Sequence, residues 1–223
     1  KVPEAVNETV KSYAPNSAER KTVKAEIKSL KSKERDIPMY INGKEVRTKN
    51  KVAIHPPHEL SHTLGHFNRG TKKHVEQAVE AALAAKESWA NMPWQERAAI
   101  FLKAADLLAG PFRAKMNAAT MLCQSKNIYQ AEIDAVAELC DFFRFNVQYL
   151  TDIYKQQPLS VPGIWNRLEY RPLEGFIFAI TPFNFTSIAA NLPGAPALCG
   201  NTCVWKPADS QIYSAAVIME VFE

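Results

Sequence analysis

Between residues 71 and 150 the apolar side chains recur every three or four positions, which is the spacing of one face of an α-helix. Thr71 can cap the first of these helices, and Pro93 suits the first turn of the second, which Gly110 ends. Two further helices are predicted over about residues 112–124 and about residues 129–150. The pattern therefore predicts a mostly helical layer.

Further along the chain the helical stripes give way to short apolar runs. Residues 176–180 form a continuous apolar run of strand length, which is typical of a parallel strand covered on both faces. A second strand is predicted over residues 202–205. Helices are predicted after each strand, over residues 187–199 with an interruption at Pro193, and over residues 213–221. Strand, helix, strand, helix is the start of a doubly wound α/β fold with a parallel sheet.

Two other extended segments are predicted. Residues 40–46 are expected to form a hairpin with Asn42 and Gly43 as its turn, and residues 165–171 alternate in the manner of a strand. These elements divide the chain into four regions. They are a basic polar arm (1–36), a hairpin with a helical part (37–157), a bridging strand region of the oligomerisation type (158–175) and a first βαβα unit (176–223).

The net charge of +4 is unevenly placed along the chain. Residues 1–51 contain 13 Lys and Arg against 7 Asp and Glu, whereas the remainder contains 14 against 16. A basic arm can indicate nucleic-acid binding. Acidic residues are mixed into this arm, however, and no aromatic residue lies between Lys21 and Arg35. We therefore favour a solvated arm, either poorly ordered or wrapped over the surface, and expect no nucleic-acid partner.

The composition indicates a globular protein, because 47% of the 223 residues are hydrophobic and no run of eighteen apolar residues occurs. We expect no membrane-spanning helix and no membrane partner. No CxxC pair is present and the histidines are not spaced to complete a zinc site, so no metal site is expected. Buried free thiols and the lack of an apolar secretory segment in the first twenty residues favour an intracellular location. The four cysteines are Cys123, Cys140, Cys199 and Cys203.

Candidate chemistry lies where the two predicted strands end, because ligands of open α/β sheets collect at the carboxyl ends of strands. Asn184 follows the first strand and supplies a neutral amide donor, which suits a developing oxyanion. Lys206 ends the second strand and supplies a cation that suits ribose hydroxyls or phosphate. On spacing alone, we favour the structural interpretation of each residue, in which Asn184 satisfies a turn and Lys206 is solvated. No GxGxxG or GxxxxGKS loop is present.

Four ordered blocks resemble the first half of aldehyde dehydrogenases. They are Arg171-Pro172-Leu173-Glu174-Gly175-Phe176, Thr181-Pro182-Phe183-Asn184-Phe185, Pro196-Ala197-Leu198-Cys199-Gly200-Asn201 and Val204-Trp205-Lys206-Pro207. The common form of the second block has Trp in place of Phe183 and Pro in place of Thr186. The version in this chain resembles the Δ1-pyrroline-5-carboxylate dehydrogenase branch of the family, and the resemblance runs from about Tyr40 to the last residue.

The resemblance implies an α/β, aldehyde dehydrogenase-like fold and NAD-dependent oxidation of L-glutamate 5-semialdehyde, a small-molecule aldehyde, to L-glutamate in proline catabolism. It implies that Asn184 stabilises the oxyanion and that NAD is bound in part by Ile180, Thr181, Pro182, Phe183 and Lys206. We place Glu138 near the substrate amino group, although a solvated helix charge is at least as good an interpretation. A homodimer or higher homo-oligomer is expected, in the mitochondrial matrix if the source is eukaryotic and otherwise in the cytoplasm.

One departure from the family pattern limits these expectations. The nucleophilic cysteine of the family sits in a Gly-Gln-x-Cys segment and its general base in a Glu-Leu-Gly-Gly segment, and neither segment occurs here. Cys199 and Cys203 lie where the family does not place its nucleophile. We therefore interpret the chain as the N-terminal part of a longer enzyme, inactive alone. The alternatives are another aldehyde dehydrogenase, such as one for succinate semialdehyde, and a shortened non-catalytic isoform that acts as an interaction module.

Overall fold

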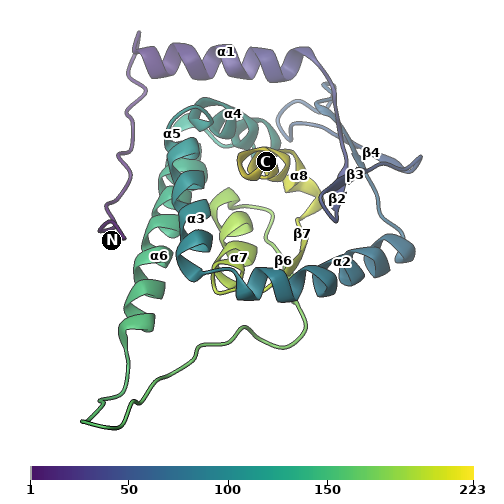
Figure 1. The fold of residues 1–223 in the computed structure, drawn as a ribbon. Helices are drawn as coiled ribbons and strands as arrows, with labels where there is room; N and C mark the ends of the chain where they lie inside the picture. The colour runs from purple at the N-terminus through teal and green to yellow at the C-terminus, as the bar shows by residue number, and fades with distance from the viewer. Residues whose placement is uncertain (1) are drawn as a thin grey trace.

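The helices predicted between residues 71 and 150 are present in the computed structural model, which describes residues 2–223 and is shown in Figure 1. The α-helices are α1 (Ala18–Ser32), α2 (Lys72–Asn91), α3 (Trp94–Ala109), α4 (Arg113–Gln124), α5 (Ile128–Ala131), α6 (Leu139–Lys155), α7 (Thr186–Leu198) and α8 (Ile212–Phe222). A π-helix, η1 (Glu132–Glu138), joins α5 to α6, and a 3₁₀ turn, η2 (Asp209–Gln211), precedes α8. None of the helices formed by residues 2–223 is long and apolar enough to cross a membrane.

The core lies where α3, α4, α6, α7 and α8 pack together (Figure 1). Phe101 of α3, Phe143 of α6 and Phe222 of α8 meet edge to face, with ring centroids 5.4–5.8 Å apart. A Cβ added to Gly194 of α7 would lie 3.3 Å from Phe143 and 3.4 Å from Phe101. Gly194 therefore lets α7 approach this cluster closely.

The predicted interruption of α7 at Pro193 is wrong, because the helix continues through Pro193 and Pro196. A proline in a helix interior removes a backbone donor and costs roughly 3 kcal/mol. Six residues of α7 are buried and the helix packs on α6, α8 and both strands of the parallel pair. Tertiary packing therefore outweighs the local preference for a break.

Strands β6 (Ile177–Ile180) and β7 (Cys203–Lys206) pair in parallel, with Ile177 opposite Cys203 and Ile180 opposite Lys206. This confirms the predicted opening of a doubly wound parallel sheet. The expectation that the first strand is covered on both faces is wrong for the described residues. Phe178 and Ile180 are 58% and 63% exposed, because helix α7 covers only the opposite face, where Ala179 is buried.

The N-terminal strands form two small sheets beside α2 (Figure 1). The predicted hairpin is confirmed, and Asn42 and Gly43 both have positive φ angles, as a two-residue turn requires. A Cβ on Gly65 would lie 2.1 Å from the carbonyl oxygen of Arg35, so only glycine fits there. The strands are β1 (Arg35–Ile37), β2 (Met39–Ile41), β3 (Lys44–Val46), β4 (Lys51–Ile54) and β5 (Gly65–Asn68), with β5 between β1 and β4.

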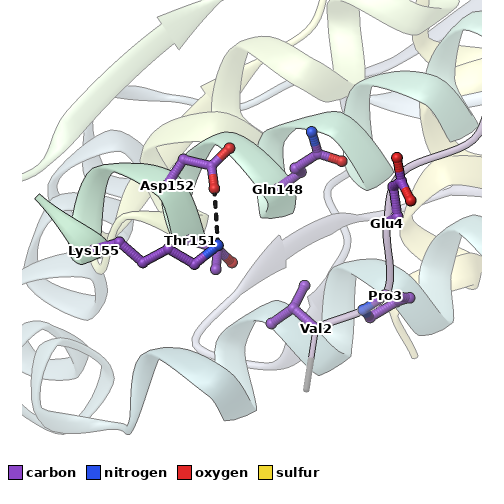
Figure 2. Close-up of a pocket in the computed structure, with 7 residues that line it drawn as sticks. All are labelled: Val2, Pro3, Glu4, Gln148, Thr151, Asp152 and Lys155. Carbon is purple, nitrogen blue, oxygen red and sulfur yellow. Dashed lines mark hydrogen bonds and ion pairs between the residues drawn. The ribbon is translucent and has the colours of Figure 1, made fainter.

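The basic arm is not poorly ordered, which corrects one of the two forms expected for it. Ser17 caps α1, and Val23 and Leu30 bury the inner side of this helix against the core. Most of the other α1 residues are charged, so the apolar stripe is too thin to stand out in the sequence. Ahead of α1 the chain runs beside α6, and Figure 2 shows the groove between Val2–Glu4 and the Gln148–Lys155 turns of that helix.

The strand predicted over residues 165–171 is absent, which is a second correction. Residues 158–175 form a long extended loop that leaves the body of the molecule at the lower left of Figure 1. One isolated bridge joins Val161 to Ile164, and Leu159 and Trp165 are 91% and 77% exposed. An alternating segment needs a neighbouring strand before it can form a ladder, and no strand within residues 2–223 lies beside it.

The single long helix predicted over residues 129–150 contains a π-helical segment in its first half. Glu132 of η1 is fully buried and receives hydrogen bonds from Arg113, from the Tyr13 hydroxyl at 2.8 Å and from the Asn117 amide at 2.7 Å. Arg113 also pairs with Glu8 at 2.6 Å, and Glu8 pairs with Arg144 at 2.8 Å. This buried network ties the N-terminal segment to α4 and α6.

Replacement of Glu132 by Gln tests the weight of this network. Glu132→Gln leaves the buried Arg113 charge without its main partner, so we expect a loss of about 3–5 kcal/mol in the free energy of unfolding. The measurement is urea unfolding followed by circular dichroism at neutral pH. Glu76→Gln is the matched control, because its pair with Lys72 is solvated, and it should change the value by at most about 0.5 kcal/mol. Equal effects of the two substitutions would contradict this account.

Candidate functional site at the carboxyl ends of the parallel strands

The two strand ends that the sequence singled out lie side by side. The Thr181 amide donates to the Lys206 carbonyl at 3.2 Å, and the Trp205 indole donates to the Thr181 hydroxyl at 3.0 Å. Thr181 is therefore buried and bonded through both its backbone and its side chain. These bonds hold the turn after β6 against the turn after β7, so residues from both turns face one edge of the sheet.

The turn from Pro182 to Phe185 projects from this edge into solvent. Phe183 and Phe185 are exposed, and so is Asn184. Within residues 2–223 the Asn184 side chain has no hydrogen-bond partner, whereas its backbone carbonyl accepts from the Lys126 ammonium at 2.5 Å. The Asn184 amide is therefore not used to satisfy its own turn, which was the structural interpretation of this residue. The side-chain amide is a free donor, and the backbone that carries it is fixed by the bond to Lys126.

A charged cluster lies at the end of β7. The Lys206 ammonium is 3.2 Å from an Asp209 carboxylate oxygen, and the Arg69 guanidinium is 2.9 Å from the other. Partial burial raises the pKa of Asp209, whereas the hydrogen bonds from Lys206 and Arg69 lower it. The lowering is the larger effect, so the pKa of Asp209 lies below its ordinary value. All three side chains stay about half exposed. The cluster therefore offers both a cation and a carboxylate to a ligand at this edge.

Glu138 reaches the same region from the end of η1. Its carboxylate is 2.6 Å from the Ser187 hydroxyl, which is also 2.8 Å from the carboxylate of Asp134. The one hydroxyl proton of Ser187 can serve only one of these acceptors at a time. Glu138 is half-buried, so it is neither the free surface charge of the alternative interpretation nor a fully enclosed group.

The first turn of α7, which follows the Asn184 turn directly, is enclosed by polar groups. Asp134 accepts the backbone N–H of Thr186 and of Ser187, both at 3.0 Å. The Thr186 hydroxyl is buried among Thr120 at 3.0 Å and Gln124 at 2.8 Å. Since the N-cap position is Phe185, which has no side-chain acceptor, Asp134 accepts the first two N–H groups of the helix in its place.

The four thiols are not placed for nucleophilic chemistry at this edge. Cys203 begins β7 and so lies at the amino end of the strands, and its thiol donates to the Pro193 carbonyl at 3.3 Å. Cys199 follows α7, whose 13 residues separate it from the Asn184 turn by roughly 20 Å. Burial raises the pKa of Cys203 to about 11 and that of Cys199 above its ordinary range. Cys123 and Cys140 are fully buried.

Several residues of the site were not singled out from the sequence. Asp209 lies three residues after Lys206, and Lys126 and Asp134 lie more than 45 residues away from the turn that they contact. The only feature of these three residues in the sequence is a charge next to an apolar run. That feature is too common to identify them as site residues. Among residues 2–223, no group of three His, Cys, Asp or Glu is arranged to hold a metal ion.

The parallel pair β6–β7 with its helices defines the chain as the opening part of an α/β fold of the doubly wound class. Residues 45–223, most of the chain, match the aldehyde dehydrogenase family. The chain therefore belongs to the aldehyde dehydrogenase family.

Several proteins similar to this chain are named as Delta-1-pyrroline-5-carboxylate dehydrogenases. The chain is 52% identical to the Delta-1-pyrroline-5-carboxylate dehydrogenase of Agaricus bisporus, over 99% of this chain and 41% of that protein. It is 45% identical to the human Delta-1-pyrroline-5-carboxylate dehydrogenase, mitochondrial, over 96% of this chain and 38% of that protein. A crystal structure of the Mycobacterium tuberculosis Delta-pyrroline-5-carboxylate dehydrogenase bound with NAD has a TM-score of 0.97 and 52% identity, and covers 100% of this chain and 42% of that one. The chain thus spans about two fifths of the length of these relatives.

Proposed function

We propose that this chain is the N-terminal part of an NAD-dependent aldehyde dehydrogenase that oxidises L-glutamate 5-semialdehyde, formed from Δ1-pyrroline-5-carboxylate, to L-glutamate. The observation that carries the proposal is the parallel register that sets Ile180 opposite Lys206. It brings an amide donor and a cation–carboxylate cluster to one sheet edge. The names of the relatives, which match nearly the whole chain at 45–52% identity, support this substrate.

Asn184 is the proposed oxyanion stabiliser. Attack of a thiolate on an aldehyde puts negative charge on the former carbonyl oxygen, and a donor that is already fixed in place stabilises this charge without reorganisation. Thr181 anchors the turn on one side and the Lys126 ammonium on the other. The exposed and unpaired amide of Asn184 fits this role. The four thiols of this chain do not fit the role of the nucleophile, so the attacking thiolate has to come from outside residues 1–223.

Lys206 and Asp209 are the proposed contacts of the cofactor ribose. An ammonium and a carboxylate 3.2 Å apart can respectively donate to and accept from neighbouring hydroxyl groups. Ile180, Thr181, Pro182 and Phe183 would line the same edge, with the exposed Ile180 and Phe183 side chains available for the flat faces of the cofactor. NAD, when bound, accepts the hydride from the oxidised carbon.

Glu138 is the proposed contact of the substrate amino group. Its half-buried carboxylate points to the α7 end that carries the Asn184 turn, as its bond to Ser187 indicates. A carboxylate there would favour an aldehyde that carries an ammonium group over one that lacks it. This preference separates L-glutamate 5-semialdehyde from succinate semialdehyde, which has no amino group.

We also propose that the extended segment 158–175 pairs with a second copy of the chain in a homodimer or higher homo-oligomer. Its exposed apolar residues and unpaired backbone fit a strand that finds its neighbour on another subunit. An intracellular location is proposed as well, in the mitochondrial matrix if the source is eukaryotic and otherwise in the cytoplasm. The word "mitochondrial" in the name of the human relative supports the first of these.

The substrate proposal predicts a selective effect of Glu138. In the full-length enzyme that contains residues 1–223, NAD reduction should be faster with L-glutamate 5-semialdehyde than with succinate semialdehyde. Glu138→Gln should raise KM for L-glutamate 5-semialdehyde by roughly tenfold, the cost of losing one charged hydrogen bond. KM for succinate semialdehyde should stay nearly constant. Unchanged kinetic constants for both aldehydes would reject the role of Glu138, and equal rates with both aldehydes would argue against the substrate.

The oxyanion proposal predicts a loss of turnover. Asn184→Ala in the full-length enzyme should lower kcat by a factor on the order of 10²–10³, because one preorganised donor is removed. Asn184→Asp should be at least as damaging, since it places a negative charge beside the oxyanion. The Kd of NAD should be nearly unchanged in both variants. Steady-state kinetics with a circular dichroism control measure this, and near-normal turnover in a folded Asn184→Ala enzyme would remove Asn184 from the site.

The cofactor proposal predicts weaker binding of NAD without Lys206. Lys206→Ala should raise the Kd of NAD about tenfold, as expected for one lost charged hydrogen bond, with little change in kcat at saturating NAD. Lys155→Ala is the matched control, because Lys155 also pairs with an aspartate three residues away but lies on α6. Residues 1–223 alone should bind NAD weakly in calorimetry. Equal Kd values for the two lysine variants would contradict the assignment of Lys206.

A further inference from the structure

Two charged residues, Lys126 and Asp134, contact the backbone of the Asn184 turn and of the helix that follows it. Lys126 contacts the turn twice, since its ammonium binds the Asn184 carbonyl and lies 4.5 Å from the centre of the Phe185 ring. The same ammonium is 2.7 Å from the Asp134 carboxylate. Asp134 then binds the next two residues of the chain through their backbone N–H groups. The pair thus contacts four consecutive residues, 184–187.

The position of Lys126 is fixed on both sides along the chain. Ser125 ends α4 in a left-handed conformation with a φ of 55°, and Asn127 caps α5 through a reciprocal bond pair with Gln130. Lys126 is the single residue between these two helix ends. Its side chain is 16% exposed, so its ammonium is largely removed from water and committed to the contacts it makes.

Asp134 is fixed by its place in η1 and by burial. Its side chain is 4% exposed, and a buried carboxylate is costly unless cations and hydrogen bonds compensate it. Lys126 and the first turn of α7 supply both, and the positive end of the helix dipole adds to them. A π-helical turn holds one residue more than an α-helical turn, and such turns recur at functional sites. Here it carries Asp134 to the start of α7.

The bond between Asp134 and the turn depends on the residue at position 186, which is threonine here. Its N–H donates to Asp134 at 3.0 Å, and a proline at this position would have no N–H to donate. The Thr186 hydroxyl is buried with Thr120, Gln124 and Ser214. A turn without the fixed φ of proline is therefore held by Asp134 and by the buried hydroxyl.

We infer that Lys126 and Asp134 form a positioning pair that holds the Asn184 amide in the geometry required for oxyanion stabilisation. The inference rests on the proposed role of Asn184 and assigns no contact with substrate or cofactor to either residue. Loss of the pair leaves Asn184 present but mobile. Small displacements of a reacting or stabilising group cost turnover rather than binding. The expected signature is therefore a fall in kcat with an unchanged Kd of NAD.

The test uses the full-length enzyme with Lys126→Met, Lys126→Arg and Asn184→Ala, and the double variant Lys126→Met/Asn184→Ala. Lys126→Met should lower kcat by roughly 10- to 100-fold, with the Kd of NAD within about twofold of its original value. Lys126→Arg, which can bind both Asp134 and the Asn184 carbonyl, should recover most of the loss. The double variant should be no slower than Asn184→Ala alone, because the pair acts only through that amide.

Glu220→Gln is the control for general destabilisation, since Glu220 binds Arg35 and Lys115 far from the turn. It should leave kcat unchanged. Hydrogen exchange gives a readout without catalysis. Backbone amides of residues 183–187 should exchange faster in Lys126→Met than in the original enzyme, whereas those of α3 should not. Asp134→Asn should act in the same direction, and the Lys126 series decides the question if that variant does not fold.

The outcomes separate the inference from the proposed function. Normal turnover in Asn184→Ala would remove the oxyanion role and the pair with it. A slow Asn184→Ala enzyme with normal turnover in Lys126→Met would overturn the pair alone. A double variant that is slower than Asn184→Ala by the full Lys126→Met factor would also overturn it, since the two residues would then act independently. Equal losses of kcat in Lys126→Met and Glu220→Gln would also overturn the inference, because the loss would then reflect general destabilisation of the enzyme.

Discussion

The carboxylates of Glu132, Asp134 and Glu138 have to be compensated, because the π-helix η1 places them in or beside the buried core. Glu132 is compensated by Arg113, Tyr13 and Asn117. Asp134 is compensated by Lys126 and the first turn of α7. The partners of Glu132 come from the N-terminal segment and α4, and those of Asp134 come from the α4–α5 connection and the first turn of α7. One helical turn therefore connects the packing of the arm to the geometry of the candidate site.

The elements that the sequence predicted correctly are those whose signal is local. The parallel strands follow from a continuous apolar run, and the hairpin follows from Asn42 and Gly43, whose positive φ angles the turn requires. The strand-end site was predicted for a related reason. Parallel strands end at the same edge, so once both strands were placed, the turn after β6 and Lys206 had to be neighbours.

The features that were missed depend on contacts between distant segments. Helix α1 has only Val23 and Leu30 as buried residues, and its packing on α4 makes it a fixed part of the molecule. The π-helical segment η1 has only 7 residues, which is too short for a periodic signature of its own. Asp134 resembles any helix carboxylate until α7 is placed against it. Residues 165–171 alternate like a strand but have no neighbouring strand within residues 2–223.

The two sides of the parallel pair β6–β7 differ in how completely this chain covers them. A two-stranded sheet is marginal by itself, and Phe178 and Ile180 stay exposed because the described residues cover only one face. The polar residues behind the Asn184 turn, by contrast, are enclosed by this chain. Thr181, Thr186 and Asp134 are buried and bonded within this chain. These residues therefore hold the turn that carries Asn184, and the thiolate of the proposed reaction is not among them. A donor that is fixed before the nucleophile arrives incurs no ordering cost during the reaction, which is the condition under which a single amide has a large effect on rate.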